Sequence, residues 1–354
     1  MKRTKLLIAA LVSTAASASA LAAPAGPPDL PSLVTGADLI VVGRAAQPAL
    51  RPDKTVETVS ITVDRVLKGR ANGSRRVTVR IDRSRAPSRG IAADQYGIFV
   101  VRAADRGVWS PVDPVHPVLP ASPTLRPASG AQGLAAVASE IASVLETPPS
   151  AITDPRTGVH DLVVGTPEFQ AGNVYLAAAG ALRSVPYSVV GPRLRTIAHS
   201  DVLPGRLWAV AALMQMGSSP QLDDIKAQGL KDVSALMLRP TPDTQFAVQM
   251  LANSIEGRVK SPAAVSTLAT LLESSDVAVR RAAASALSDI ATPAVVAPLA
   301  KVGLNDSDDD VRYFSVLGLA EATHAQDAPP METFKADPSR YESFWRGWAS
   351  TNLR

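Results

Sequence analysis

An eight-residue apolar segment that ends in leucine recurs five times in the second half of this sequence, and it constrains the fold more than any other feature. The copies begin at Tyr175, Arg206, Thr244, Arg280 and Arg312, so successive starts are separated by 31, 38, 36 and 32 residues. This period fits a unit of two helices and two turns. A helix pair of this length cannot bury both of its apolar faces alone, so the units are expected to stack into an α-helical solenoid.

The clearest unit shows both of its helices and their start signals. Ser261-Pro262 places an N-cap before a proline at the first helical position, and an apolar stripe follows from Val265 to Leu272. Ser274-Ser275-Asp276 then begins a second helix that runs to Ile290. Small side chains inside the five segments let neighbouring helices approach closely, in keeping with an aromatic content of only 4%.

Two of the second helices begin with the pattern Asp-x-x-Val-Arg, at Asp276 to Arg280 and at Asp308 to Arg312. On these residues the segment 131–354 resembles HEAT repeats. The resemblance implies that the aspartates cap helices and that the arginines pair with acidic groups between repeats. Thr244 stands where the family has arginine. We expect about five repeats.

The first half shows strand patterns instead. Residues 37–43 form a short apolar run closed by glycine, residues 59–63 and 77–81 alternate apolar with polar side chains, and residues 96–101 form a fourth strand. Asn72-Gly73 between the two alternating segments favours a hairpin. Strands without intervening helical patterns predict an antiparallel sheet, closed into a small barrel or folded as a sandwich, over residues 37–109.

Three short motifs in this half carry a second resemblance. They are Ala-Asp-Leu-Ile-Val-Val-Gly at 37–43, Val-Leu-Lys-Gly at 66–69 and Tyr-Gly-Ile-Phe at 96–99. Their order resembles a β-domain of secreted bacterial proteins, and its layout is similar to the OB-like barrel of netrin and metalloproteinase-inhibitor domains. The disulfides of the animal members are absent, because the chain has no cysteine. The resemblance implies a fold and nothing about activity.

Prolines spaced about three residues apart follow the strands, at positions 111, 114, 117, 120, 123 and 127. Such spacing enforces extended, polyproline-like backbone. We expect a stiff linker over residues 110–130, with a proline-rich recognition peptide as the alternative.

The N-terminus has the order of a secretory signal. Basic residues at 2, 3 and 5 precede an apolar run at 6–12 and a small-residue site at Ala20-Leu21-Ala22. The pattern predicts a signal peptide over residues 1–22, a leader over residues 23–36, and a mature protein in the periplasm or outside the cell. The apolar run is shorter than the ~20 residues that span a bilayer, so no transmembrane segment is expected.

Charge differs between the two halves. Residues 24–130 carry 15 Lys and Arg against 9 Asp and Glu, whereas residues 131–354 carry 18 against 23. This asymmetry is compatible with docking of the halves or with separate partners. Five arginines are expected to form one outward basic face: Arg75, Arg76, Arg80, Arg83 and Arg85.

A merely solvated surface is the first interpretation of this basic face, and the functional alternative is that it binds an anionic envelope polymer, a lipid surface or an acidic protein. Nucleic acid is not expected, because the protein is exported and no aromatic residues interleave to stack bases.

Aromatic residues concentrate at the C-terminus. Phe344 and Trp348 are four residues apart, hence on one helical face, and Trp345 lies between them. A terminal repeat must cover the apolar end of its stack, so we expect a cap. A platform for a sugar or a protein partner is the alternative.

Catalytic signatures are missing. Without cysteine the chain has no thiolate nucleophile and no cysteine-ligated metal, and it contains no G-x-S-x-G, S-x-x-K or H-E-x-x-H motif. The adjacent pair His160-Asp161 is more typical of a surface turn than of a catalytic dyad. Asp306, Asp308 and Asp310 alternate as calcium ligands do, but Val311 and Leu317 stand where an EF-type loop needs glycine and glutamate.

We therefore expect no catalytic residue, no metal and no cofactor. The sequence predicts an exported binding or scaffolding protein whose solenoid recognises one or more proteins of the cell envelope. The alternative is an envelope enzyme or enzyme accessory, similar to lyase-like HEAT proteins, with a site between the β-domain and the solenoid.

Overall fold

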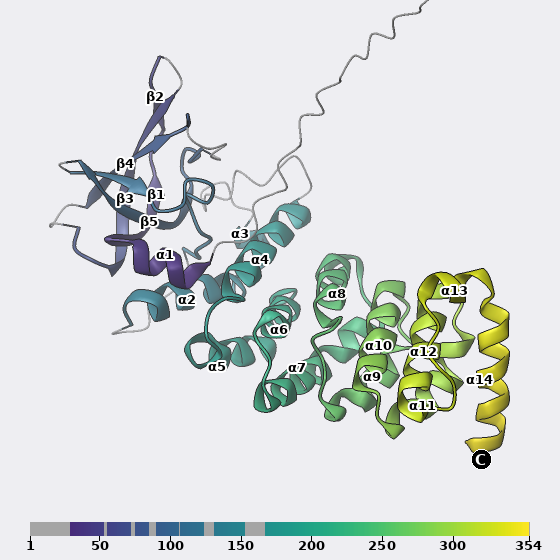
Figure 1. Ribbon diagram of the computed structural model, residues 1–354. Helices are drawn as coiled ribbons and strands as arrows, with labels where there is room; N and C mark the ends of the chain where they lie inside the picture. The colour runs from purple at the N-terminus through teal and green to yellow at the C-terminus, as the bar shows by residue number, and fades with distance from the viewer. Residues whose placement is uncertain are drawn as a thin grey trace, which may run out of the picture.

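The computed structural model describes residues 29–52, 55–71, 75–84, 90–105, 107–123, 131–152 and 167–353. An N-terminal β barrel is followed by an α-helical solenoid that extends away from it toward the C-terminus (Figure 1). The predicted fold class is thereby confirmed. The segment predicted as a signal peptide lies outside the described residues.

The barrel is closed by five strands, and a sixth short strand extends one of them. In order around the barrel, β1 pairs with β5, β5 with β6, β6 with β4, β4 with β3, and β3 again with β1. All of these pairs are antiparallel except β4 with β6, which is parallel. The strands are β1 (Leu39–Ala45), β2 (Ala49–Leu50), β3 (Val56–Lys68), β4 (Arg76–Asp82), β5 (Tyr96–Asp105) and β6 (Val108–Pro111).

The two kinds of strand pattern in the sequence correspond to two kinds of burial. β4 alternates between buried and accessible positions, because only its inner side meets the barrel core. β1 is almost entirely buried, because it is covered on both sides. Its Leu39 and Val41 face the barrel core, whereas Ile40 and Val42 belong to a second core shared with the helices. The predicted pairing of β3 with β4 is confirmed, with Val59 opposite Val79.

The β-domain is larger than the sequence predicts at both ends. Helix α1 (Leu30–Gly36) lies within the predicted leader, and Leu30, Leu33 and Val34 are buried in the second core. On the other side, Val112 N–H donates to Val100 C=O, and the backbones of Ile98 and Leu119 exchange two hydrogen bonds.

The first part of the predicted stiff linker over residues 110–130 thus lies against the barrel strands, and residues 124–130 lie outside the described residues. The non-proline residues between the prolines still donate backbone hydrogen bonds, so this extended chain can lie along the barrel.

The solenoid consists of successive helix pairs closed by a C-terminal pair. The five recurring segments lie in the second helices, which stack directly on one another. These are α4 (Pro167–Leu182), α6 (Gly205–Gln215), α8 (Pro242–Ile255), α10 (Val277–Ile290) and α12 (Asp309–Thr323). The first helices are α2 (Gly133–Val144), α5 (Tyr187–Ala198), α7 (Pro220–Leu238), α9 (Val265–Leu271) and α11 (Pro293–Lys301).

Shorter elements complete the helical region. The turn α3 (Pro149–Ile152) precedes α4, and 3₁₀ turns occur at Pro262–Ala264 and Gly303–Asn305. The chain ends with α13 (Met331–Ala336) and α14 (Pro338–Asn352), and α14 stands at the end of the stack (Figure 1).

Barrel and solenoid dock on each other, a question that the charge pattern left open. One apolar core runs without interruption from β1, β5 and α1 into α2 and the helices beyond. Polar contacts join the same parts, such as Ser184 Oγ accepting from Leu30 N–H at 3.2 Å and Thr147 Oγ1 donating to Ser122 Oγ at 2.7 Å. The first helix pair therefore covers one side of the barrel.

Candidate functional site

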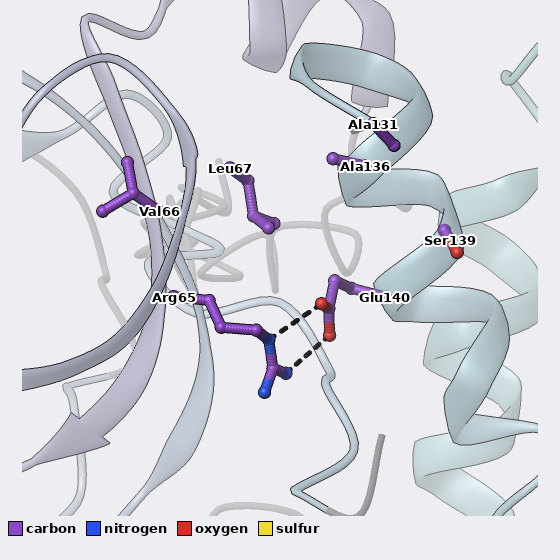
Figure 2. A pocket seen from close by; sticks show the side chains of 7 residues that line it. All are labelled: Arg65, Val66, Leu67, Ala131, Ala136, Ser139 and Glu140. Carbon is purple, nitrogen blue, oxygen red and sulfur yellow. Dashed lines mark hydrogen bonds and ion pairs between the residues drawn. The ribbon is translucent and has the colours of Figure 1, made fainter. Parts of the chain in front are cut away.

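The first candidate is a cleft where β3 leaves the barrel and meets α2. Its volume is about 280 Å³, and its walls are Leu67 and Val66 on the strand side and Ala131, Ala136 and Ser139 on the helix side. Figure 2 shows Arg65 and Glu140 pointing toward each other across this junction. This is the place where the enzyme alternative would put its site.

The charged pair in this cleft is bidentate and largely buried. Arg65 Nε donates to Glu140 Oε1 at 3.0 Å and Nη2 donates to Oε2 at 2.8 Å, with the side chains 17% and 3% exposed. Burial alone would lower the pKa of the Arg65 guanidinium, but the hydrogen bonds and charge of Glu140 outweigh it and raise that pKa. A general base must be able to accept a proton from a substrate, and this carboxylate accepts from Arg65 instead. The geometry suits a junction that holds two domains together.

Tyr96 supports the same junction from β5. Its side chain is 4% exposed, and Arg44 lies over its ring with the guanidinium carbon 5.5 Å from the centroid. Burial raises the pKa of Tyr96 to about 12, an effect that the nearby Arg65 charge partly opposes. The phenol is therefore neutral at physiological pH, as the phenol of a free tyrosine also is.

The predicted basic face is divided by the structure. Arg76 and Arg80 do point outward from β4, as alternation requires. Arg80 forms an ion pair with Asp105 at 2.8 Å, and Arg83 forms one with Glu57, which is 1% exposed. Arg75 is exposed, and Arg85 lies outside the described residues. Arg83 lies in the turn after β4 and is exposed, although its guanidinium pairs with the buried Glu57. Whether the remaining arginines bind an anion stays a prediction.

The aromatic residues of the predicted cap differ in how deeply they are buried. Trp345 is 1% exposed, and its ring contacts those of Phe344 at 5.1 Å and Trp348 at 5.7 Å between centroids. Phe344 is 40% exposed, so it lies at the surface of the cluster. The buried face of α14 consists of Tyr341, Glu342 and Trp345, and Trp348 packs at its edge.

The aspartate-rich turn before α12 is occupied by protein groups. Asp308 caps α12 by accepting from the N–H groups of Asp310 and Val311, and Arg281 donates to its carboxylate at 2.6 and 2.8 Å. The Arg281 hydrogen bond lowers the pKa of Asp308. Asp306 accepts from Arg280 Nε at 2.7 Å. Within the part of the chain that the structure describes, no group of three His, Cys, Asp or Glu side chains is arranged for a metal ion.

The roles implied for the two recurring motifs are confirmed. Asp276 caps α10 by accepting from Ala278 and Val279 N–H, as Asp308 caps α12. Arg280 reaches forward to Asp306, and Arg312 reaches forward to Glu342 of α14 at 2.8 Å. Each arginine thus connects its repeat to the next helical unit.

The second helices of the pairs, which we also call the inner helices, are not equally accessible to solvent. α6 is apolar on every side and nearly all of it is buried, because α5 and α7 pack on it and α4 and α8 meet over it. Its Trp208 lies between Tyr175 and Phe246, and the Phe246 ring also presses against Gly172 of α4. The accessible surface along the second helices is therefore interrupted at this repeat.

Accessible inner positions remain on α8, α10 and α12. We call this surface the C-terminal inner face; its members recur at equivalent repeat positions and comprise Gln249, Asn253, Asp289, Phe314, Leu317 and Glu321. Phe314 and Leu317 are only partly buried against the core, although both are large and apolar. Sequence reasoning missed this face. Its signal is that Asn253, Asp289 and Glu321 occupy one repeat position, nine residues after the start of their segments, and that all three are polar.

A groove on the opposite helix layer was also missed by the sequence analysis. It lies between α5 and α7, has a volume of about 420 Å³, and is lined by His199, Arg195 and Asp232 together with apolar residues. No pattern in the sequence relates these two helices at side-chain level.

The comparisons with known proteins bear on the helical region. Residues 240–320 match the family model described as HEAT repeats. No curated protein matches the chain. Two similar solved structures are both described as engineered proteins. One is 19% identical, with a TM-score of 0.33, 55% of this chain and 92% of the other being covered. The second is 20% identical, with the same TM-score and coverages of 62% and 60%.

None of the helices in the described ranges is both long and apolar enough to cross a bilayer. The matched residues run from the start of α8 through most of α12, the repeats in which the capping aspartates and bridging arginines were found. The helical C-terminal region of this chain contains HEAT repeats and follows a small β barrel.

Proposed function

We propose that this protein is an exported, non-catalytic scaffold that binds a protein partner through the C-terminal inner face. The observation that supports it most is the pair Phe314 and Leu317, two large apolar side chains left partly accessible on α12. Solvent-accessible apolar side chains on an ordered surface are typical of protein interaction sites.

The ion pairs between repeats add to this argument. Arg280, Arg281 and Arg312 connect successive repeats through carboxylates that lie at the turns. A surface that is already ordered loses little conformational entropy on binding, so its contacts are retained as affinity. The flanking Asp289 and Glu321 would surround an apolar contact with a polar rim, as protein interfaces do.

The barrel supplies a fixed N-terminal attachment in this proposal. It is continuous with the solenoid core and is joined to it by Arg65 and Glu140. The junction cleft, whose carboxylate is paired, favours this structural role over a chemical one.

Export is proposed from the sequence alone, on the basic, apolar and small-residue order of residues 1–22. Mass spectrometry of the protein recovered from the envelope fraction should show a mature chain that begins near Ala23. A recovered chain that retains Met1 and the apolar run contradicts this part of the proposal.

The binding experiment uses the mature protein as bait in envelope extract, followed by reconstitution with each captured protein after purification. Leu317→Glu and Phe314→Glu should abolish the reconstituted binding, because each places a charge in the apolar contact. Phe344→Glu is the matched control, since Phe344 is an equally large apolar side chain on the outer side of the cap and is 40% exposed. Loss of binding with Phe344→Glu alone would move the interface to the cap and contradict the proposed face.

A further inference from the structure

The groove between α5 and α7 has features that the packing of a repeat does not require. It is lined on one side by Pro192, Arg195 and His199 of α5 and its C-cap, and on the other by Ile225 and Asp232 of α7. Its volume of about 420 Å³ falls in the range of sites that hold small ligands or a few side chains of a bound peptide. Its lining combines apolar side chains, such as those of Leu213 and Ile225, with polar ones, such as those of Arg195 and Asp232.

The groove is open because α7 has a glycine where a side chain would fit. A Cβ on Gly229 would approach Val210 and Leu213 no closer than 3.6 Å, an ordinary contact. By contrast, a Cβ on Gly172 or Gly318 would come within 2.8 or 2.5 Å of a neighbouring side chain. Glycine inside a helix is unfavourable relative to alanine. Steric packing explains Gly172 and Gly318, but Gly229 is explained by the space that it leaves free.

The two helices that form the groove are connected by one arginine of α6. Arg206 of α6 donates from Nε to the Ala198 C=O of α5 at 3.1 Å and from Nη2 to the Asp232 C=O of α7 at 3.3 Å. The groove is thus preorganised, which limits the entropy that a ligand would lose in ordering it.

Of the charged side chains that line the groove, the arginine is the one that could contact a ligand. Asp232 is already satisfied, because Gln228 donates to Oδ1 at 2.7 Å and His199 Nε2 lies 3.1 Å from Oδ2. His199 Nδ1 lies 2.7 Å from the Arg195 C=O, so both ring nitrogens face acceptors. The Arg195 guanidinium is exposed and has no hydrogen bond or ion pair within the described residues.

We propose that this groove binds an acidic peptide segment of a partner protein, with a large apolar side chain in the groove and a nearby carboxylate on Arg195. An apolar anchor combined with a charge contact is the way in which helical grooves recognise peptides. The proposal rests on the proposed scaffold function and adds a second, chemically distinct contact on the other helix layer.

In the test, a library of short random displayed peptides is selected for binding to the intact mature protein. The affinity of each enriched peptide is then measured. Enriched peptides should combine a large apolar residue with Asp or Glu within one helical turn. Gly229→Leu, which fills the groove, and Arg195→Glu, which reverses its charge, should each weaken binding by about tenfold or more. Arg183→Glu is the matched control, since Arg183 is an exposed arginine at the end of α4, away from the groove. It should bind normally.

Three results overturn the proposal. No sequence is enriched, enriched peptides bind Gly229→Leu and Arg195→Glu as well as they bind the parent, or a fluorescent fatty acid occupies the groove and is excluded by Gly229→Leu. Circular dichroism of each variant establishes that it is folded before its affinity is interpreted. Failure of the groove proposal can be told apart from failure of the scaffold function, because binding of the captured partner would then still depend on Phe314 and Leu317.

Discussion

At the scale of single residues, this protein is stabilised by contacts between buried apolar side chains and by ion pairs that involve its buried carboxylates. Leu287 is fully buried in α10, whereas Val277 on the same helix is 40% exposed. Glu57 and Glu140, with 1% and 3% exposure, each face an arginine. Burying an unpaired carboxylate would be very unfavourable, so these arginines have structural roles that their position in a basic stretch of sequence does not reveal.

The leucine that ends each recurring segment should be a core position. Leu287→Ala should reduce the free energy of unfolding by about 2 to 5 kcal/mol, because it removes buried methyl groups and leaves a cavity. Denaturant unfolding measures this change. Val277→Ala is the control on the same helix and should cost less than about 0.5 kcal/mol. Similar values for the two variants would contradict the alignment of the repeats.

Tyr96 should make the protein less stable at high pH. Its pKa is about 12 in the folded state and about 10 in an unfolded chain. The folded protein therefore holds this proton more tightly, and that contribution is complete below pH 10 and is lost as the pH rises toward 12. The loss should amount to roughly 2 to 3 kcal/mol in denaturant titrations across this interval. Tyr96→Phe should show a smaller loss, and an equal loss in both proteins would place the effect elsewhere.

At the scale of elements, the helices differ in how many sides they bury. α10 and α12 begin at capping aspartates and keep an accessible side, whereas α6 is enclosed by four neighbouring helices. Glycines allow several of these close approaches, as Gly172 does for Phe246. The spacing of the repeats is similar along the chain, but the accessible surface of the second helices is interrupted at α6.

Two glycines inside helices should respond oppositely to the same substitution. Gly229→Ala should raise the free energy of unfolding by about 0.5 to 1 kcal/mol, because alanine has the higher helix propensity and its Cβ fits. Gly318→Ala should lower it, because its Cβ would lie 3.0 Å from the Ser288 Cα and 2.5 Å from Leu299. Thermal unfolding of the two variants provides the comparison. Destabilisation by Gly229→Ala would show that the groove cannot accept even a methyl group.

At the scale of the whole molecule, barrel and solenoid share one apolar core, and the ion pair of Arg65 with Glu140 stands beside it. Ile40 and Val42 of β1 and Ile98 and Val100 of β5 would be exposed to water if the barrel stood alone. The first helix pair is thus as much a part of the β-domain as of the solenoid. Among the residues that the structure describes, the opposite charges of the two halves meet at this junction in the bidentate pair of Arg65 and Glu140.

Removing one member of that pair should lower the free energy of unfolding more than removing both. Arg65→Met leaves Glu140 buried without its partner and should destabilise the protein by roughly 3 to 5 kcal/mol. The double variant Arg65→Met with Glu140→Leu should recover most of this loss, because no charge is then left buried. Denaturant unfolding of the two single variants and the double variant gives the coupling free energy. Additive effects would mean that the pair does not connect the two domains.

Much of the fold was predictable because it depends on local periodicity. The five recurring segments, the capping aspartates at 276 and 308 and the alternating strands β3 and β4 all follow from residues close together in the sequence. The domain boundaries were not predictable in this way. Leu30 and Leu119 are buried by contacts with distant segments, and neither lies in a periodic pattern.

The candidate sites depend even more on tertiary structure. Hydrophobic periodicity and helix caps act over a few residues, so the division into a strand half and a repeating helical half can be predicted from the amino acids alone. The pairing of the arginines, the enclosure of α6, the accessibility of Phe314 and Leu317, and the groove bordered by Arg195 and Gly229 all depend on how the elements pack. Side-chain pairing and exposure are set by contacts between elements, and the partner of Arg65, for example, stands 75 positions further along the chain.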